Sequence, residues 1–580
     1  MTTFNNVNNV NDGSVQTVAT NHRRGAPRRM VNPDRYIHRE ISIVVFIGLA
    51  LFMAGIHCFI VGACTVHRVG RIIGTHVLFA AVFYVFGWRC YIHPYYWSEL
   101  RHIPTVPGCP IWGQFFDIIT EECGVPQRRW HHQYGPYVRY FFPFGAERLS
   151  IAGEEGLRHM TQRNPYNYPK PVRAKKWMER ILGEGVLLAE GETHALQRKA
   201  LAPAFSGPGI RALMPVFWEK AVLMSNVWKE SFKRQNKKVL SVEVLDWLNR
   251  CTLDIIGKAG FGYEINSLTE RNNNVRRAYQ LVFNFSPSAR IQHGVQAFWP
   301  VTKHLPTQMN RDVEEARSII IDKAMEILNA RLNEAENSHG GKDILTLIAR
   351  ENKNIKASGE EGLSFDEMRD QVMTFLGAGH DTTATAVAWA LHLLAQHPEV
   401  QEKLRDEIRK HFLFLFREAT RNDPENWYHD PHKLPYLEKV CRESLRFIPP
   451  IPMTVRQTVT DDQVGPYFIP KGTVIYMLAN VTNRLKDFWG PTADEFNPDR
   501  WDELPDTVQG HAYFTFLAGP RSCIGRKFAE TEMKILLCAL LSKYEFYPNF
   551  EWEDPEEHKM WRLVLRPLEG VHLYAKIIEN

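Results

Sequence analysis

The stretch FTFLAGPRSCIG at residues 514–525 decides the fold, because it holds one cysteine in a loop built around glycines. Cys523 lies between Gly519 and Gly525 and follows Arg521. Glycine lets a backbone approach a flat cofactor closely, and a thiolate that binds iron needs hydrogen-bond donors near its sulfur. The loop is therefore a candidate cofactor site in which Cys523 would be the metal ligand. The alternative is a structural cysteine, the commoner fate of a single buried thiol.

Upstream of this loop, residues 364–397 have the pattern of one helix of more than thirty residues. Ser364 and Glu367 form a capping box at its start, and Pro398 closes it. Its middle, AGHDTT at 378–383, is unusual for a helix interior, since glycine costs about 1 kcal/mol there and threonine hydroxyls compete for backbone carbonyls. Such a turn indicates a functional use. The alternative is a threonine bonded to the carbonyl one turn back.

Two other predicted helices carry pairs of polar side chains. Glu443 and Arg446 are three residues apart in KVCRESLRF, and His194 and Arg198 are four apart in GETHALQRKALAPAF at 191–205. Such pairs usually form a solvated helix face and contribute about 0.3 kcal/mol. On their own they would indicate no function.

Taken together and in this order, the motifs resemble those of the cytochrome P-450 family. The haem loop of that family reads F-x-x-G-x-R-x-C-x-G, and every fixed position is met by Phe516, Gly519, Arg521, Cys523 and Gly525. The resemblance covers roughly residues 100 to 575. It implies the mainly α fold with minor β content of that family, and haem b bound axially by the Cys523 thiolate.

The resemblance also implies roles for the other motifs. The pair Glu443 and Arg446 would lock with Arg500 as structural support beneath the haem, although FNPDRW departs from the usual P-E-R-F wording of that loop. Asp381 and Thr382 would relay protons to oxygen. One histidine, in place of the usual tryptophan, and three arginines would bind the haem propionates: His194, Arg198, Arg456 and Arg521.

The N-terminal part is predicted to anchor the chain in a membrane. Ile41–Val66 is an apolar run longer than the ~20 residues that a span needs, whereas Ile72–Trp88 is marginal. One or two transmembrane helices are therefore possible. Two spans joined by HRVGR would keep the basic N-terminal tail and the catalytic domain together in the cytosol, as the positive-inside tendency requires. The predicted organisation is a disordered basic tail at 1–40, the anchor at 41–92, a proline-rich hinge at 93–111 and one haem-thiolate monooxygenase domain at 112–580.

Composition excludes several other classes of protein. With 44% hydrophobic and 23% charged residues, the chain is globular. A net charge of +5 over 580 residues, without a basic patch in the body of the chain, gives no support to nucleic-acid binding. The nine cysteines are scattered and include no C-x-x-C pair, which favours reduced thiols facing the cytosol over a secreted disulfide framework.

The expected function is a membrane-bound monooxygenase that uses dioxygen. Too few residues follow Cys523 for a flavin domain, so the electrons are expected from NADPH through a separate cytochrome P-450 reductase. Arg198, Lys199, Arg526 and Lys527 would flank the face on which that reductase docks. The motif wording looks most like fungal microsomal members, which implies the endoplasmic reticulum membrane and secondary metabolism.

The substrate is predicted to be lipophilic. The segments expected to line the pocket are apolar or aromatic: the helix around Phe375 and Ala378, Ile451–Val455, and Phe283–Phe298. Such a lining favours a terpenoid, sterol, polyketide or fatty acid. Two alternatives are a rearrangement or dehydration without oxygen activation, and a non-enzymatic haem or sterol binder. The acid and alcohol of the proton relay argue against both.

Overall fold

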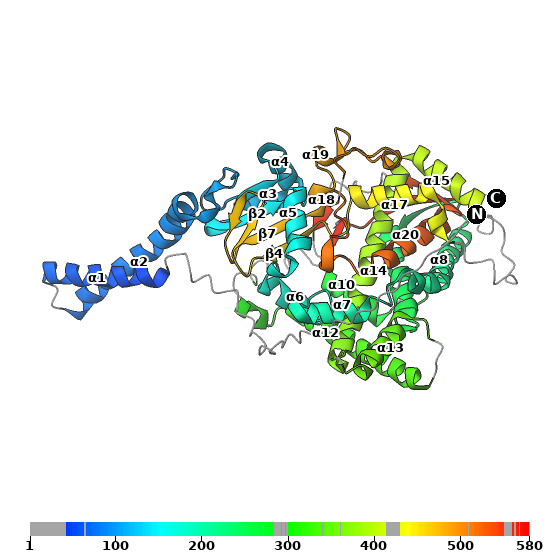
Figure 1. Cartoon of the computed structure of the whole chain (residues 1–580), viewed down its shortest axis with the longest axis horizontal. Helices are drawn as coiled ribbons and strands as arrows, with labels where there is room; N and C mark the ends of the chain where they lie inside the picture. The colour runs from blue at the N-terminus through cyan, green and yellow to red at the C-terminus, as the bar shows by residue number, and fades with distance from the viewer. Residues whose placement is uncertain are drawn as a thin grey trace, which may run out of the picture.

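The computed structural model describes residues 42–578 with several short gaps. Helices dominate, and the largest of the small sheets lies to one side of them (Figure 1). The predicted tail at 1–40 lies outside the described residues. The gaps are 63–64, 271, 284–291, 293–295, 297–299, 338–340, 360, 413–429, 509, 550, 552–558, 562–563 and 568.

Helix α14 (Phe365–Gln396) forms the centre of the domain (Figure 1). The predicted capping box is present, since the Ser364 hydroxyl accepts from the Glu367 backbone and the Glu367 carboxylate accepts from the Ser364 backbone. The helix ends before Pro398, as predicted. Its middle is buried against helices α9, α12 and α20, which fixes the AGHDTT turn inside the protein.

The other long helices surround α14. Their bounds in chain order are α6 (Val172–Leu182), α7 (Gly191–Leu201), α8 (Gly207–Gln235), α9 (Val244–Ile255), α10 (Asn274–Phe283), α12 (Gln308–Asn337), α13 (Ile344–Ala357), α15 (Pro398–His411), α17 (Pro435–Phe447) and α20 (Arg526–Leu541). Shorter helices are α3 (Phe115–Thr120), α4 (Val125–Tyr134), α5 (Glu154–Arg158), α18 (Ala479–Thr482) and α19 (Lys486–Trp489).

The largest sheet has four strands in the order β1-β2-β7-β4. Strands β2 and β7 pair in parallel and the other pairs are antiparallel, with Arg456 of β4 opposite Ile475 of β7. A three-stranded sheet has the order β3-β11-β8, and two hairpins pair β5 with β6 and β9 with β10. The strands are β1 (Tyr137–Phe142), β2 (Ala146–Ile151), β3 (Val239–Glu243), β4 (Met453–Gln457), β5 (Asp462–Val464), β6 (Tyr467–Ile469), β7 (Val474–Leu478), β8 (Tyr544–Pro548), β9 (Lys559–Trp561), β10 (Leu565–Pro567) and β11 (His572–Ile577).

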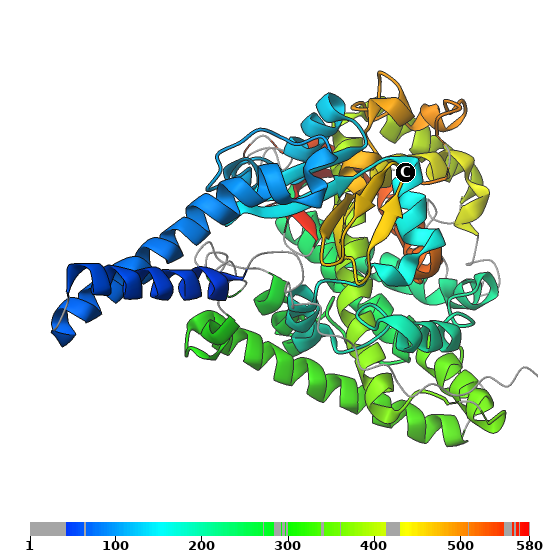
Figure 2. The ribbon, with the colours of Figure 1, turned by 60° about the vertical axis from the view of Figure 1, so that its left-hand side comes forward.

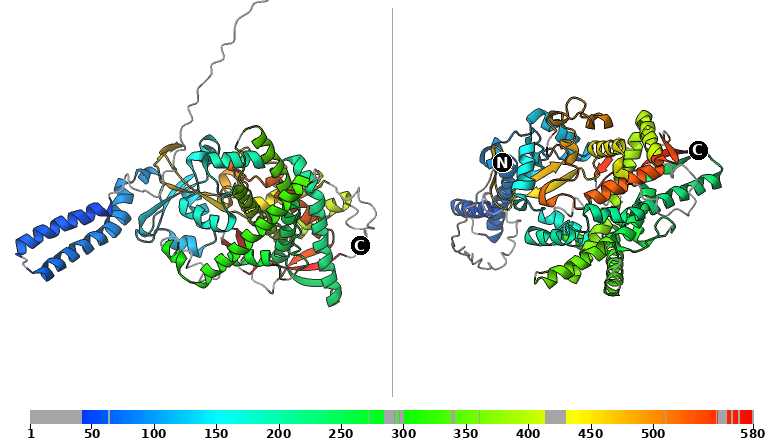
Figure 3. Two further views of the ribbon diagram at one scale, coloured as in Figure 1. Left: turned by 90° about the horizontal axis from the view of Figure 1, so that it is seen from below. Right: turned by 45° about the vertical axis from the view of Figure 1, so that its right-hand side comes forward.

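Two apolar helices project from the domain as an antiparallel hairpin (Figures 2 and 3). Helix α1 (Ile43–Val61) has 19 residues, and α2 (Val66–Val82) continues through π-helical turns to Trp97, giving 32 residues. Both are long and apolar enough to cross a membrane by length and composition.

The structure corrects two predicted boundaries of the anchor. HRVGR is not a hinge but forms the first turns of α2, because the chain turns earlier, at Gly62, whose left-handed backbone caps α1. The second helix also runs past residue 92 to Trp97, with Pro94 accommodated in the π-helical turns.

The end of this helix is attached to the first hairpin of the large sheet. The Arg139 guanidinium of β1 donates to the carbonyl of Pro94 at 2.7 Å and pairs with Glu147 of β2. The Ser98 hydroxyl donates to Glu147 at 2.9 Å. These contacts fix the base of the hairpin against the rest of the domain.

Candidate active site

A cavity of about 2450 Å³ lies between Cys523 and helix α14. The Cys523 side chain is exposed and lines this cavity. The Cys523 N–H donates to the carbonyl of Phe516 at 2.9 Å. Burial raises the pKa of the Cys523 thiol, while the Gly525 N–H and the Arg198 charge act in the opposite direction. The thiol is thus placed, with a donor near its sulfur, to bind a ligand in the cavity.

The two glycines of the loop differ in their surroundings. Gly525 lines the cavity and has open space where a Cβ would lie. Gly519 has a φ of +69°, and a Cβ there would lie 1.8 Å from the carbonyl oxygen of Thr161. Gly519 therefore allows a tight turn against the backbone of Thr161, and it is Gly525 that lies along the cavity.

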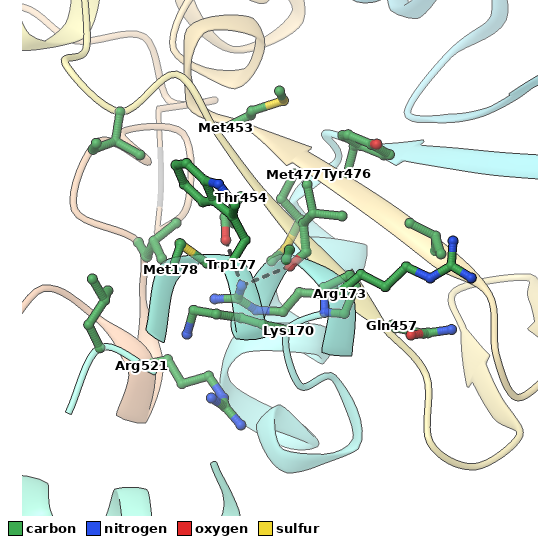
Figure 4. A pocket seen from close by; sticks show the side chains of 18 of the residues that line it. Lys170, Arg173, Trp177, Met178, Met453, Thr454, Gln457, Tyr476, Met477 and Arg521 are labelled. Carbon is green, nitrogen blue, oxygen red and sulfur yellow. Dashed lines mark hydrogen bonds between the residues drawn. The ribbon is translucent and has the colours of Figure 1, made fainter. Parts of the chain in front are cut away.

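A group of cations lies at one edge of the cavity (Figure 4). Arg456 is 4% exposed, and burial and the nearby Arg521 lower its pKa to about 10. Arg521 pairs with Glu190, which is also buried. Lys170 lies close to the same carboxylate at 3.9 Å, and burial, followed by the charge of Arg456, lowers its pKa to about 7. Three cations thus share one carboxylate in a poorly solvated place, which favours binding of a further anion.

His194 and Arg198 of α7 lie beside this group. His194 is 3% exposed, its Nδ1 lies 3.1 Å from the Tyr166 hydroxyl, and burial lowers its pKa to about 4. The ring is therefore neutral and can donate one hydrogen bond. Arg198 lines the cavity but donates to the carbonyl of Ser522 at 2.5 Å and to the Ser522 hydroxyl at 3.1 Å. In the structure this arginine braces the residue that precedes Cys523.

Asp381 and Thr382 of α14 line the cavity together with Cys523. The Thr382 hydroxyl donates to the carbonyl of Ala378 at 2.9 Å, which is the bond one turn back that any mid-helix threonine can form. The helix is continuous through this turn. Asp381 is 1% exposed and its carboxylate pairs with Arg566 of β10. The alcohol and the acid are therefore adjacent to the same space, with the acid held by a cation.

The structure brings Glu443, Arg446 and Arg500 together. The guanidinium of Arg446 bonds both carboxylate oxygens of Glu443, at 2.8 and 2.9 Å, and both side chains are fully buried. The other donors of Arg446 bind the carbonyls of residues 483, 493 and 495. Arg500 donates to Glu443 at 2.8 Å. A buried charge pair needs this degree of hydrogen bonding to offset its loss of hydration.

The predicted pocket segments line the cavity in part. Phe375 and Ala378 of α14 line it, as do Ile451, Met453, Thr454 and Val455 at the start of β4. Of the region Phe283–Phe298, most lies outside the described residues, and Gln296 lines the cavity. Trp177 and Met178 of α6, which the sequence did not single out, add apolar surface (Figure 4).

Three charged residues of the site were missed by sequence reasoning. Lys170 and Glu190 lie in loops without periodicity, and Arg566 follows Asp381 by 185 residues. The only local signal is a lysine between two prolines in YPKP at 168–171. Their proximity depends on the fold and not on any spacing.

The residues present fit a haem. A cysteine thiol faces a large, mainly apolar cavity, the backbone at Gly525 leaves open space beside it, and the surplus of buried cations at the edge matches a ligand with two carboxylates. Cys523 would bind the iron, and the cations around Arg456 would bind the carboxylates. This set of features defines a haem-thiolate protein.

Comparison with known proteins gives the same assignment. The family model for cytochrome P-450 matches residues 104–574. The chain is 32% identical to the cytochrome P-450 monooxygenase ALT8 of Alternaria alternata, with 87% of this chain and 94% of that protein covered. It is 33% identical to FUM15 of Gibberella moniliformis, with 80% and 85% covered, and 34% identical to cytochrome P-450 monooxygenase 205 of Postia placenta, with 81% and 90% covered. This chain belongs to the cytochrome P-450 family, and it is a monooxygenase.

Proposed function

We propose that this monooxygenase is membrane-anchored, takes electrons from NADPH through a separate cytochrome P-450 reductase, and oxidises a lipophilic substrate. The observation that carries the proposal is the cavity that joins the Cys523 thiol to Asp381 and Thr382 and extends to the base of the apolar hairpin. When bound, a thiolate-ligated haem supplies activation of dioxygen and cleavage of its O–O bond.

Each end of the cofactor would be held by this chain's own side chains. Cys523 would be the metal ligand, supported by the Gly525 N–H and by the carbonyl of Phe516, which accepts from the Cys523 N–H. Arg456 and Arg521 bind the propionates, with His194 as a neutral donor and Lys170 as an added cation. Arg198 acts through Ser522 on the position of the cysteine.

Asp381 and Thr382 move protons in this proposal. The Thr382 hydroxyl donates a hydrogen bond to the Ala378 carbonyl, so its oxygen can accept a hydrogen bond from the side of the cavity. The Asp381 carboxylate, one residue away on the same turn, takes a proton from water and passes it on. The non-oxygenase alternatives would give this pair of residues no role.

The cavity favours a lipophilic substrate that arrives from the membrane. Its apolar part is formed by Trp177, Met178, Met453 and Met477 (Figure 4), together with Phe375. Its far end is lined by residues at the base of the hairpin: Tyr84, Arg89, His93 and Trp97. A terpenoid, sterol, polyketide or fatty acid would fit such a lining. We place the enzyme in secondary metabolism because its motifs resemble those of fungal microsomal members.

The reductase would dock on the face behind Cys523. Lys199, Arg526 and Lys527 are exposed there, and Arg198 lies deeper beside Ser522. Positive side chains steer an acidic partner to such a face. This arrangement requires the catalytic domain to face the cytosol, on the endoplasmic reticulum membrane.

The ligand assignment is tested by the carbon monoxide difference spectrum of the reduced protein. Cys523→Ser should lose the thiolate signature, because an alcohol cannot supply the same electron density to iron. The controls are Cys441→Ser and Cys538→Ser, which remove buried thiols away from the cavity and should keep the signature. An unchanged spectrum for Cys523→Ser would refute the assignment.

The substrate class is tested by titration of the haem spin state. Terpenoid or sterol-like compounds should shift it when they bind in the cavity, whereas charged, hydrophilic compounds should not. Tight binding of a hydrophilic compound would contradict an apolar substrate site. A metabolite comparison of the host with and without the gene then identifies the compound.

A further inference from the structure

Arg148 of β2 lines the cavity and carries a positive charge that no carboxylate neutralises. Its guanidinium lies 5.1 Å from the centre of the Phe142 ring and donates to the backbone carbonyl of Glu147 at 2.7 Å. The carboxylate of Glu147 is bound instead by Arg139 of β1 and by the Ser98 hydroxyl. Among the residues that the structure describes, Arg148 therefore has no ion-pair partner.

This guanidinium is poorly solvated. The side chain is half-buried, and its Nε atom is enclosed by protein without a hydrogen-bond acceptor among the described residues. Arginine keeps its charge at neutral pH, and a partly desolvated charge gains from the approach of an anion. Its planar array of donors fits a carboxylate better than a lysine does. Arg148 is therefore placed to bind an acid that enters the cavity.

Tyr476 of β7 supplies a second donor beside Arg148 and also lines the cavity. Burial raises the pKa of Tyr476, while the charge of Arg148 and a hydrogen bond from it act in the opposite direction. The hydroxyl is therefore protonated at neutral pH, and its O–H can donate to an anion. Figure 4 shows Tyr476 across the pocket from Arg521, so this pair of donors is separate from the cations at the cofactor edge.

The cavity combines further positive charge with an apolar wall. Lys176 of α6 and Lys303 before α12 line it, and neither forms an ion pair with a described carboxylate. Lys176 directly precedes Trp177 and Met178, which supply much of the apolar surface (Figure 4). A few charged groups in a mainly apolar pocket fix the orientation of a ligand that has one charged end. The lining thus fits an amphiphile with an anionic group.

We propose that the substrate is a lipophilic acid whose carboxylate binds to Arg148 and Tyr476. Its apolar body extends along Met477 and Trp177 toward Cys523. The inference rests on the proposed function, because it names the class of compound that the same cavity takes. It narrows that class to acids, such as a fatty acid, a polyketide acid or a terpenoid acid.

A phospholipid headgroup would offer Arg148 the same anionic chemistry, since residues at the base of the apolar hairpin also line the cavity. We assign the site to the substrate because Arg148 is half-buried and lines the same cavity as Cys523. A lipid that stays in the bilayer is bound more readily by exposed side chains. The two sources of the anion are separated by experiment below.

The first test compares each acid with its own methyl ester. The probes are dodecanoic, hexadecanoic and dehydroabietic acid with their esters, each titrated against the haem spin state of the full-length protein. At least one acid should bind about tenfold or more tightly than its ester, because the ester lacks the charge that Arg148 recognises. Arg148→Met should abolish this preference by weakening the binding of the acid and leaving that of the ester unchanged.

Three further variants define the cause of the preference. Arg148→Lys keeps the charge without the planar donors and should give an intermediate affinity for the acid. Tyr476→Phe should weaken the acid by a smaller factor than Arg148→Met does. The matched control is Arg129→Met, which removes an arginine that pairs with Glu121 on the surface and lies outside the cavity lining, and it should change neither affinity. An unchanged ester affinity shows that each variant is folded.

The second test separates the substrate from a lipid headgroup. The full-length protein is placed in nanodiscs of phosphatidylcholine, with or without phosphatidylserine. The factor by which Arg148→Met weakens the acid should be the same in both bilayers. If that factor disappears when phosphatidylserine is present, the headgroup occupies Arg148, and the assignment to the substrate is overturned.

The outcomes also distinguish this inference from the proposed function. If the esters shift the spin state and no acid binds more tightly than its ester, the lipophilic substrate stands and the acid is wrong. The same conclusion follows if Arg148→Met weakens acid and ester alike. If neither acids nor esters shift the spin state, the lipophilic substrate itself is wrong, and the acid is rejected with it.

Discussion

The indole Nε1 of Trp501 donates a hydrogen bond to Oε2 of Glu443 at 3.1 Å. Trp501 replaces the phenylalanine that the family usually has in this loop, and a phenylalanine could not make this bond. Glu443 also accepts from Arg446, Arg500 and the backbone of Asn497. The departure from the family wording thus adds one donor to a carboxylate that is fully buried.

Truncation of this carboxylate should be far more costly than loss of the indole. Glu443→Ala leaves the buried Arg446 without its counterion and should destabilise the fold by about 3–5 kcal/mol, with loss of bound haem. Trp501→Phe removes one hydrogen bond and should cost about 1 kcal/mol. Denaturant unfolding and the haem content of the purified protein measure both effects.

A surface ion pair supplies the control for this comparison. Lys439 pairs with Asp502, whose side chain is 58% exposed. Lys439→Ala should change stability by less than about 1 kcal/mol. If Lys439→Ala lowered the free energy of unfolding as much as Glu443→Ala does, the buried network would contribute no more to stability than a surface ion pair.

Removal of the Thr382 hydroxyl should uncouple the enzyme. Thr382→Ala should keep haem and substrate binding, while NADPH is consumed to form peroxide or water, because only the delivery of protons is disturbed. Thr382→Ser retains a hydroxyl and should stay coupled. The ratio of product to NADPH is the measurement, and full coupling of the alanine variant would place the relay elsewhere.

Asp462 should contribute to stability in a way that depends on pH. Burial opposes its ionisation, but hydrogen bonds from His159, Tyr168, Asn164 and Asn167 outweigh burial and hold the pKa of Asp462 below its ordinary value. Because the folded pKa is depressed, this contribution is full above the unfolded pKa of about 4 and is lost as pH falls through the folded value.

Asp462→Asn should therefore lower stability at pH 7 by about 1–3 kcal/mol, and the difference from the wild type should shrink below about pH 4. Asp502→Asn, on the surface, should show no such dependence. Unfolding midpoints from pH 3 to pH 8 measure the difference. A difference that grows toward low pH would contradict the assigned direction of the pKa.

The hairpin of α1 and α2 predicts that the N-terminus and the catalytic domain lie on the same side of the membrane. A glycosylation tag within the first twenty residues should stay unmodified, and glycosylation of the tag would refute two spans. The sequon at Asn480 should also stay unmodified, since its side chain is 8% exposed and bonds the carbonyl of Cys123. The sequon at Asn284 lies outside the described residues.

The parts of the site that the sequence predicted are those encoded in short contiguous patterns. The Cys523 loop and the capping box of Ser364 and Glu367 each lie within about a dozen residues, so spacing alone indicated them. The family, the mainly helical fold and the monooxygenase activity followed from such patterns and are confirmed. The pairing of Arg566 with Asp381 follows from strand packing against α14, which no local pattern contains.

The glycine and threonine patterns were harder to interpret, because one residue type serves several purposes. Gly519 gives a tight turn against Thr161, whereas Gly525 faces open space, and the sequence does not separate the two. Thr382 bonds the carbonyl of Ala378 as a structural threonine would, and also lines the cavity. Only the surroundings of each residue distinguish these cases.

Because the hairpin is attached to the first sheet, the cavity would lie close to the membrane surface. The substrate concentration that matters to the enzyme would then be the concentration in the lipid. Arg139 and Pro94 fix the base of the hairpin to β1, and Tyr84 and Arg89 at that base line the cavity. A lipophilic compound would then reach the cavity by diffusion within the bilayer, at a concentration set by its partition between lipid and water. The apparent KM should therefore vary with the ratio of lipid to protein in the assay. A KM calculated from the concentration in the buffer would combine the partition coefficient of the substrate with the affinity of the enzyme.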